Sequence, residues 1–136
     1  MPVCADKRWD MELIVDNATT SNLFTFDITV DNETISGWVT DDDGNRTELS
    51  GRCSVASPAG QREVSLMDFR FIARAIHGDV EILMGGIGFQ PTDQTLKPVF
   101  LGNFIAVAPT IVLAAVPTLP VGIDEGETGT GNGQQT

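Results

Sequence analysis

The chain has few of the residues on which most catalytic and metal sites depend. It contains one histidine, two cysteines, no tyrosine and only two lysines. A Ser-His-Asp or Cys-His arrangement would have to use His77, which we place in a tight turn, and zinc needs more His and Cys ligands than are present. The acidic run Asp41–Asn45 lacks EF-hand spacing and is typical of a solvated turn, with weak surface calcium as the alternative. We therefore expect no metal and no cofactor.

Positive charge is scarce, whereas negative charge is abundant. The 136 residues include 8 Lys and Arg against 19 Asp and Glu, a formal net charge of −11. An acidic surface repels phosphate backbones and anionic lipid headgroups. We expect no nucleic-acid partner and no membrane association. Residues 1–10 carry charges and have no apolar stretch, so no signal peptide is visible and a cytoplasmic location is favoured.

Two features leave alternatives open. Cys4 and Cys53 could form a disulfide or both be free, since spacing does not decide between these states. Asn-x-Thr sequons at Asn17, Asn32 and Asn45 could carry glycans. Asn and Thr are also common in β-turns and strands, which is the reading we favour.

What the sequence does contain is strand-like alternation, clearest in Arg62–Phe89. We predict a long β-hairpin that turns at His77-Gly78, because alternate side chains on each strand then share a face. Beyond Gly85-Gly86 the apolar phase shifts to Ile87 and Phe89, and a one-residue shift at glycine is typical of a β-bulge. The cross-strand pairs that this turn predicts are Ala75–Val80, Ala73–Ile82, Phe71–Met84 and Arg74–Glu81.

The rest of the chain supplies enough further strands for a closed sheet. Short connections imply antiparallel neighbours, so we predict an all-β, eight-stranded antiparallel up-and-down barrel, with a β-sandwich as the alternative. The expected organisation is an N-terminal arm (1–8), the barrel (9–117) and a flexible Pro/Gly-rich acidic tail (118–136). The further strands are expected at Trp9–Val15, within the hairpin Leu23–Thr40, and at Glu48–Val55, Val99–Ala108 and Thr110–Val116.

Residues 98–123 carry no charge. A membrane span needs about 20 apolar residues, but Gly102-Asn103 and Pro109 interrupt this run and β-branched residues are frequent in it. We favour buried strands. An apolar arm that docks on a neighbouring subunit is a third reading.

Four strands share a pattern of an apolar residue, a small residue or glycine, and a return to alternation. These segments are Ile35-Ser36-Gly37-Trp38, Leu49-Ser50-Gly51-Arg52, Met84-Gly85-Gly86-Ile87 and Leu101-Gly102-Asn103-Phe104. The pattern resembles the small barrels of the calycin and avidin-like groups. With Asp41–Gly44 before Gly51-Arg52-Cys53, it is also similar to the allene-oxide-cyclase barrels. That resemblance implies a hydrophobic substrate in the barrel mouth. Biotin binding is not carried over, because the chain has two Trp and no Tyr.

Function is therefore expected to lie in a small barrel that binds a hydrophobic small molecule in its interior. Such a barrel could be a cofactor-free cyclase, for which Glu63 is the candidate proton-transfer residue. The alternative is an assembly subunit, a homo-oligomer joined through the outward residues Trp38, Ile72 and Leu83 and the apolar C-terminal arm. The residues expected to contact an interior ligand are Phe26, Ile28, Phe69, Phe71, Ile82 and Met84.

Overall fold

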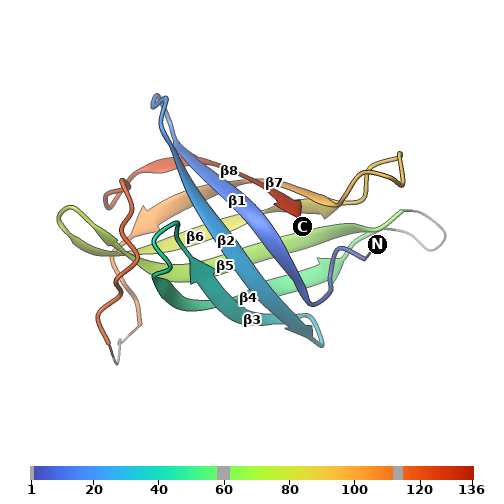
Figure 1. Ribbon diagram of the computed structural model, residues 1–136, viewed down its shortest axis with the longest axis horizontal. Coiled ribbons are helices and arrows are strands. Elements are labelled where there is room, and N and C mark those ends of the chain that lie inside the picture. The colour runs from blue at the N-terminus through green and yellow to red at the C-terminus, as the bar shows by residue number, and fades with distance from the viewer. Residues whose placement is uncertain (1, 58–61, 112–114) are drawn as a thin grey trace.

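Eight antiparallel strands close into one barrel in sequence order, with β8 paired to β1 (Figure 1). The computed structural model describes residues 2–57, 62–111 and 115–136. The closed sheet confirms the predicted up-and-down barrel and excludes the sandwich. The strands are β1 (Lys7–Val15), β2 (Ser21–Asp31), β3 (Thr34–Thr40), β4 (Arg46–Val55), β5 (Val64–Ala75), β6 (Gly78–Phe89), β7 (Val99–Val107) and β8 (Thr128–Gln135).

The β2–β3 hairpin has the register that the sequence predicts. Val30 lies opposite Ile35, and Phe26 lies opposite Val39. Asn32 and Glu33 form the turn at φ 50° and 71°, and this left-handed pair matches the twist of the flanking strands.

The β5–β6 hairpin turns one residue earlier than expected. Ala75 pairs with Gly78, so Ile76 and His77 form the turn. Gly78, at φ 121°, supplies the left-handed residue after the turn. Every predicted pair is thus displaced by two residues, although the faces are unchanged because two is the strand period. The observed pairs are Ala73–Val80, Phe71–Ile82, Phe69–Met84 and Arg74–Asp79.

The predicted bulge at Gly85-Gly86 is wrong. The β5–β6 ladder runs unbroken through Asp68–Gly85 and Met67–Gly86. Ile87 and Phe89 therefore point outward, while the inward positions beyond Met84 are glycines. The shift of the apolar pattern at Ile87 and Phe89 is therefore due to apolar residues on the outer surface of β6.

The flexible tail is also corrected, because its last part is the strand that closes the barrel. β8 pairs with both β1 and β7. Of the apolar run expected as a strand at 110–116, residues 110, 111, 115 and 116 lie outside any strand, and residues 112–114 fall outside the described part. The barrel therefore takes its eighth strand from the region that we assigned to the tail.

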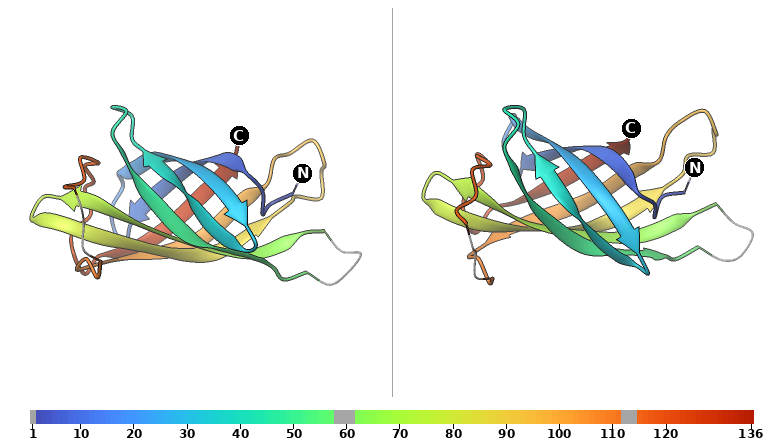
Figure 2. Two further views of the ribbon diagram at one scale, coloured as in Figure 1. Left: turned by 90° about the horizontal axis from the view of Figure 1, so that it is seen from below. Right: turned by 60° about the horizontal axis from the view of Figure 1, so that its bottom comes forward.

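Two segments close the ends of the barrel (Figure 2). We call the described parts of the β7–β8 connection, residues 108–111 and 115–127, the strap. The strap buries Leu119, Val121 and Ile123 in the core, and it bonds to Arg74 through Leu119 O and Val121 N at 2.8 and 2.9 Å. At the opposite end lies the N-terminal arm, residues 2–6, whose Val3 is fully buried.

Candidate functional site

The six residues predicted to bind an interior ligand all lie in the core, at most 4% exposed. Four ring pairs meet edge to face: Phe26–Phe69 at 5.2 Å, Phe69–Phe100 at 5.5 Å, Phe26–Phe71 at 5.6 Å and Phe24–Phe71 at 5.7 Å between centroids. These contacts stabilise a packed core. The side chains meant to hold a ligand thus pack on one another. Ligand binding by Phe26, Ile28, Phe69, Phe71, Ile82 and Met84 stays a prediction.

Glu63, the candidate for proton transfer, anchors the N-terminal arm. Its Oε2 accepts a hydrogen bond from Val3 N at 2.6 Å, and its Oε1 accepts from Cys4 N and Ser65 Oγ, both at 3.3 Å. Cys4 also forms a disulfide with Cys53 of β4. Both carboxylate oxygens are therefore engaged with the chain itself, and catalysis by Glu63 stays a prediction.

The predicted interface residues have different environments. Trp38 is 41% exposed, with Arg46 Cζ 4.5 Å from its ring centroid, and Leu83 is half-buried on the outer face. Ile72 is only 3% exposed, so its expected place on an exposed face is wrong. It lies opposite Glu81, to which the strap bonds through Thr110, and the strap closes over this end of the sheet.

An apolar surface lies on the outer side of β5, β6 and β7, at the end where β5 begins. Pairing across the three strands aligns six outward residues in two rows, and the exposed members are 36–56% accessible. Its signal in the sequence was the shift to Ile87 and Phe89, which we had assigned to a bulge. We call these residues the β5–β7 face: Val64, Phe89 and Val99 in one row, and Leu66, Ile87 and Leu101 in the other.

Part of the β5–β7 face forms a groove of about 710 Å³. The residues that line it are Ala56, Ser57, Arg62, Val64, Ile87, Phe89, Gln90 and Leu101. The outer side of β1 and β2 differs, because charged pairs such as Arg8–Asp27 (Nε–Oδ1 2.7 Å) lie there. The outer side of β1 and β2 thus carries charged pairs, whereas the two rows of the β5–β7 face are apolar.

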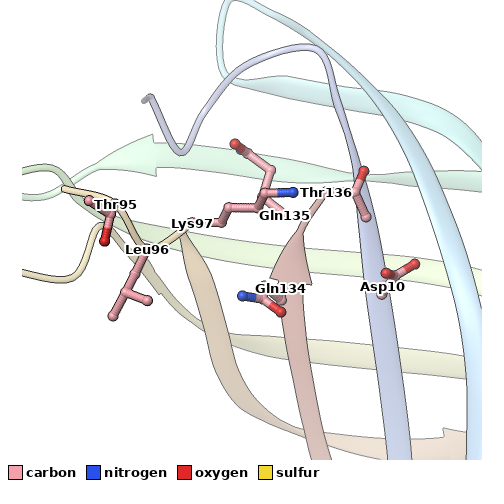
Figure 3. A pocket seen from close by; sticks show the side chains of 7 residues that line it. All are labelled: Asp10, Thr95, Leu96, Lys97, Gln134, Gln135 and Thr136. Carbon is pink, nitrogen blue, oxygen red and sulfur yellow. The ribbon is translucent and has the colours of Figure 1, made fainter. Parts of the chain in front are cut away.

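A smaller, polar pocket of about 390 Å³ lies where β8 ends (Figure 3). Thr95, Leu96 and Lys97 border it from the β6–β7 loop, across from Asp10 and residues 134–136. The loop is held by Gln90 Nε2, which donates to Leu96 O at 2.7 Å. Asp93 Oδ1 accepts from Thr95 N at 2.9 Å and from Thr95 Oγ1 at 2.6 Å.

The Thr95 bonds predict a titration that can be measured. The side-chain hydroxyl of Thr95, then its backbone amide, lower the pKa of Asp93 below the usual value. A depressed pKa stabilises the folded loop above the unfolded pKa, about 3.9, and this contribution is lost as pH falls through the folded pKa. Thr95→Val should raise the pKa of Asp93 toward the usual value in an NMR titration. Thr92→Val, an exposed control in the same loop, should not; an unmoved pKa in Thr95→Val would contradict the assignment.

Within the described ranges, no three His, Cys, Asp or Glu side chains gather as metal ligands. The same residues contain no helix long and apolar enough to cross a membrane. Comparison of the chain with protein-family models, curated proteins and solved structures found no match. A proposal about function therefore has to start from the geometry of the chain itself.

Proposed function

We propose that this barrel is an assembly subunit that binds a second copy of itself through the β5–β7 face. The observation that supports the proposal is the alignment of six outward apolar residues in two rows over three adjacent strands. Exposed apolar residues are normal when scattered, whereas a contiguous patch marks an interaction surface. The rows are contiguous because the ladder places their members directly opposite one another.

The closed sheet restricts how two copies can join. A barrel has no free strand edge, so a partner cannot add a strand and must pack on outer side chains. Two copies of a chain with net charge −11 repel each other, but the six residues of the β5–β7 face carry no charge, and Arg62 at the edge of the groove is positive. An uncharged apolar face is self-complementary, as a two-fold interface requires.

The energy of such an interface is sensitive to single changes. Burying a half-exposed apolar side chain is worth about 1 kcal/mol, so six on each copy supply roughly 12 kcal/mol. Association costs about 4–15 kcal/mol in lost translational and rotational freedom. Because these terms are similar in size, one buried charge on the face should abolish binding.

The test compares two substitutions of matched exposure on opposite sides of the barrel. Leu101 of the β5–β7 face is 53% exposed and Leu23 of β2 is 52% exposed. We expect the parent and Leu23→Lys to be dimers and Leu101→Lys to be a monomer in native mass spectrometry and sedimentation velocity. A monomeric parent at about 100 μM, or equal effects of the two lysines, would reject the proposal.

A second candidate function is the binding of a hydrophobic small molecule in the groove on the same face. The volume of about 710 Å³ is within the usual range of ligand pockets, about 300–1,000 Å³. Native mass spectrometry of protein from its own source also tests this function. A monomer that carries an apolar compound, with the compound lost in Leu101→Lys, would favour ligand binding over self-association. A cofactor-free cyclase reaction in this barrel stays a prediction.

A further inference from the structure

The end of the barrel opposite the strap is filled by the chain's own N-terminal arm. Val3 is fully buried, with 0% of its surface accessible to solvent, and it packs in the hydrophobic core. It lies beside Gly88 and Met67: a methyl group built on Gly88 would stand 2.6 Å from Val3 Cγ1 and overlap Met67 Sδ. Glycine at position 88 therefore leaves the space that the valine occupies.

Side chains of the barrel also bind the backbone of the arm. Glu63 accepts from Val3 N at 2.6 Å and from Cys4 N at 3.3 Å. Gln135 Nε2 donates to Pro2 O at 3.1 Å. These groups recognise peptide amides and a carbonyl, which every extended segment offers. The side chains particular to this arm are Val3, Cys4 in its disulfide and Asp6, whose Oδ1 accepts from Val30 N at 2.8 Å. Backbone hydrogen bonds plus one side-chain pocket is the usual arrangement of peptide recognition.

The arm leaves two buried polar groups at this end without a partner. Trp9 Nε1 and Gln135 Oε1 have no hydrogen bond to any described residue, although Trp9 is 0% and Gln135 1% exposed. The two residues lie opposite each other in the β1–β8 ladder. Buried polar groups are normally paired, and an unpaired donor and acceptor favour an occupant that satisfies them. The arm is thus an incomplete ligand for this end.

We propose that Trp9, Glu63, Met67, Gly88 and Gln135 form a peptide-binding socket, which the arm occupies in the free chain. In its place the socket takes an extended peptide from another molecule, with a β-branched apolar residue at the Val3 position. The amides of that peptide donate to Glu63 and to Gln135 Oε1, and its carbonyls accept from Gln135 Nε2 and from the Trp9 indole. This site is separate from the β5–β7 face and does not depend on self-association.

The Cys4–Cys53 disulfide determines how easily the arm is displaced. It ties the arm to β4, so the arm competes as an intramolecular ligand at an effective concentration on the order of millimolar. A free peptide should bind weakly while the tether is intact. Replacing both cysteines by serine removes this cross-link to β4, while the arm stays joined to β1 at Lys7, and it leaves the socket residues unchanged.

The experiment uses the full chain with Trp38→Phe, which makes Trp9 the only indole, since the sequence has two Trp. The probe is the acetylated, amidated peptide Pro-Val-Ser-Ala-Asp, which copies residues 2–6 with serine for cysteine. The control peptide has aspartate at the valine position. In the background Val3→Asp/Cys4→Ser/Cys53→Ser, Trp9 fluorescence should show the valine peptide binding at least tenfold more tightly than the aspartate peptide. Equal affinities in a variant that still unfolds cooperatively would overturn the proposal.

Two further variants test the socket, the first of them with the disulfide intact. Val3→Asp with the disulfide intact should increase acrylamide quenching of Trp9, and the valine peptide should reverse the increase; quenching equal to the parent would overturn the proposal. Glu63→Gln, added to the background Val3→Asp/Cys4→Ser/Cys53→Ser, should weaken binding of the valine peptide about tenfold, because two amides of the peptide lose a charged acceptor. An unchanged affinity would remove Glu63 from the socket. Leu101→Lys should leave peptide binding as it is.

Discussion

Gly129→Ala should lower the free energy of unfolding by about 3 kcal/mol or more, because no side chain fits at this inward position of β8. A Cβ at Gly129 would overlap the carbonyl oxygen of Ile14 and stand 2.6 Å from Phe104 Cε1. The Phe104 ring can shift only within a packed core, and the Ile14 carbonyl belongs to the adjacent strand. Relief of the overlap therefore requires β1 and β8 to move apart at the seam that closes the barrel.

Gly85→Ala is the matched control, since Gly85 also lies in a strand and has ordinary backbone angles. Its added Cβ would meet no atom closer than 3.9 Å. Stability should be unchanged or rise by about 0.5–1 kcal/mol, as the unfolded chain loses freedom. Urea unfolding followed by tryptophan fluorescence measures both variants. A similar loss of unfolding free energy in the two variants would mean that the close approach of β1 and β8 at Gly129 does not require glycine.

The same crowding explains why the last strand could not be predicted from the sequence. The first three inward positions of β8 are Gly129, Gly131 and Gly133, and the space at these glycines is taken by the side chains of Phe104, Met84 and Met11; the fourth inward position is the polar residue Gln135. A strand that contributes no apolar side chain has no hydrophobic alternation, so it was assigned to a flexible tail. The signal it does carry is glycine at every second position, with polar residues between.

Strands with large inward residues were predicted well, down to their faces. Alternation in β2 and β5 depends on side chains that the core needs, and those residues are buried. Register was less certain, because a shift of two residues preserves every face. Only the turn separates the two registers in β5–β6, and there Gly78 takes the left-handed conformation after the turn instead of within it.

The candidate sites were harder to predict, because each depends on segments far apart in the sequence. The socket joins Val3 to Glu63 and Gln135, which are 60 and 132 residues further along. The β5–β7 face requires the pairing of three strands, and the buried position of Ile72 requires the strap. Periodicity within one strand contains none of this information.

The ion pair beneath the strap also could not be predicted from the sequence. We expect its two partners to differ in how much stability is lost when each is replaced. Glu81 is 1% exposed, and its Oε2 lies 2.9 Å from Nε of Arg70, whose side chain is 45% exposed. Glu81 Oε1 accepts from Thr110 N at 2.7 Å and from Thr110 Oγ1 at 2.6 Å. The sequence had paired Glu81 with Arg74, which lies opposite Asp79. Because Glu81 is buried and Arg70 is half-exposed, replacing Arg70 should change the stability by a different amount from replacing Glu81.

Arg70→Met should cost about 3 kcal/mol, because it leaves a buried carboxylate without its cation. Glu81→Gln should cost only about 1–2 kcal/mol, since the guanidinium left behind can turn to water. Arg74→Met, an exposed control, should stay within about 0.5 kcal/mol of the parent. Urea unfolding gives all three values.

The double variant Arg70→Met/Glu81→Met separates the cost of a buried charge from the loss of the pair. It should be more stable than Arg70→Met alone, because no charge remains beneath the strap. If the double variant is instead the least stable, the Thr110 bonds to Glu81 hold the strap in place and the ion pair is secondary. Equal losses in Arg70→Met and Arg74→Met would show that the buried carboxylate does not need its cation.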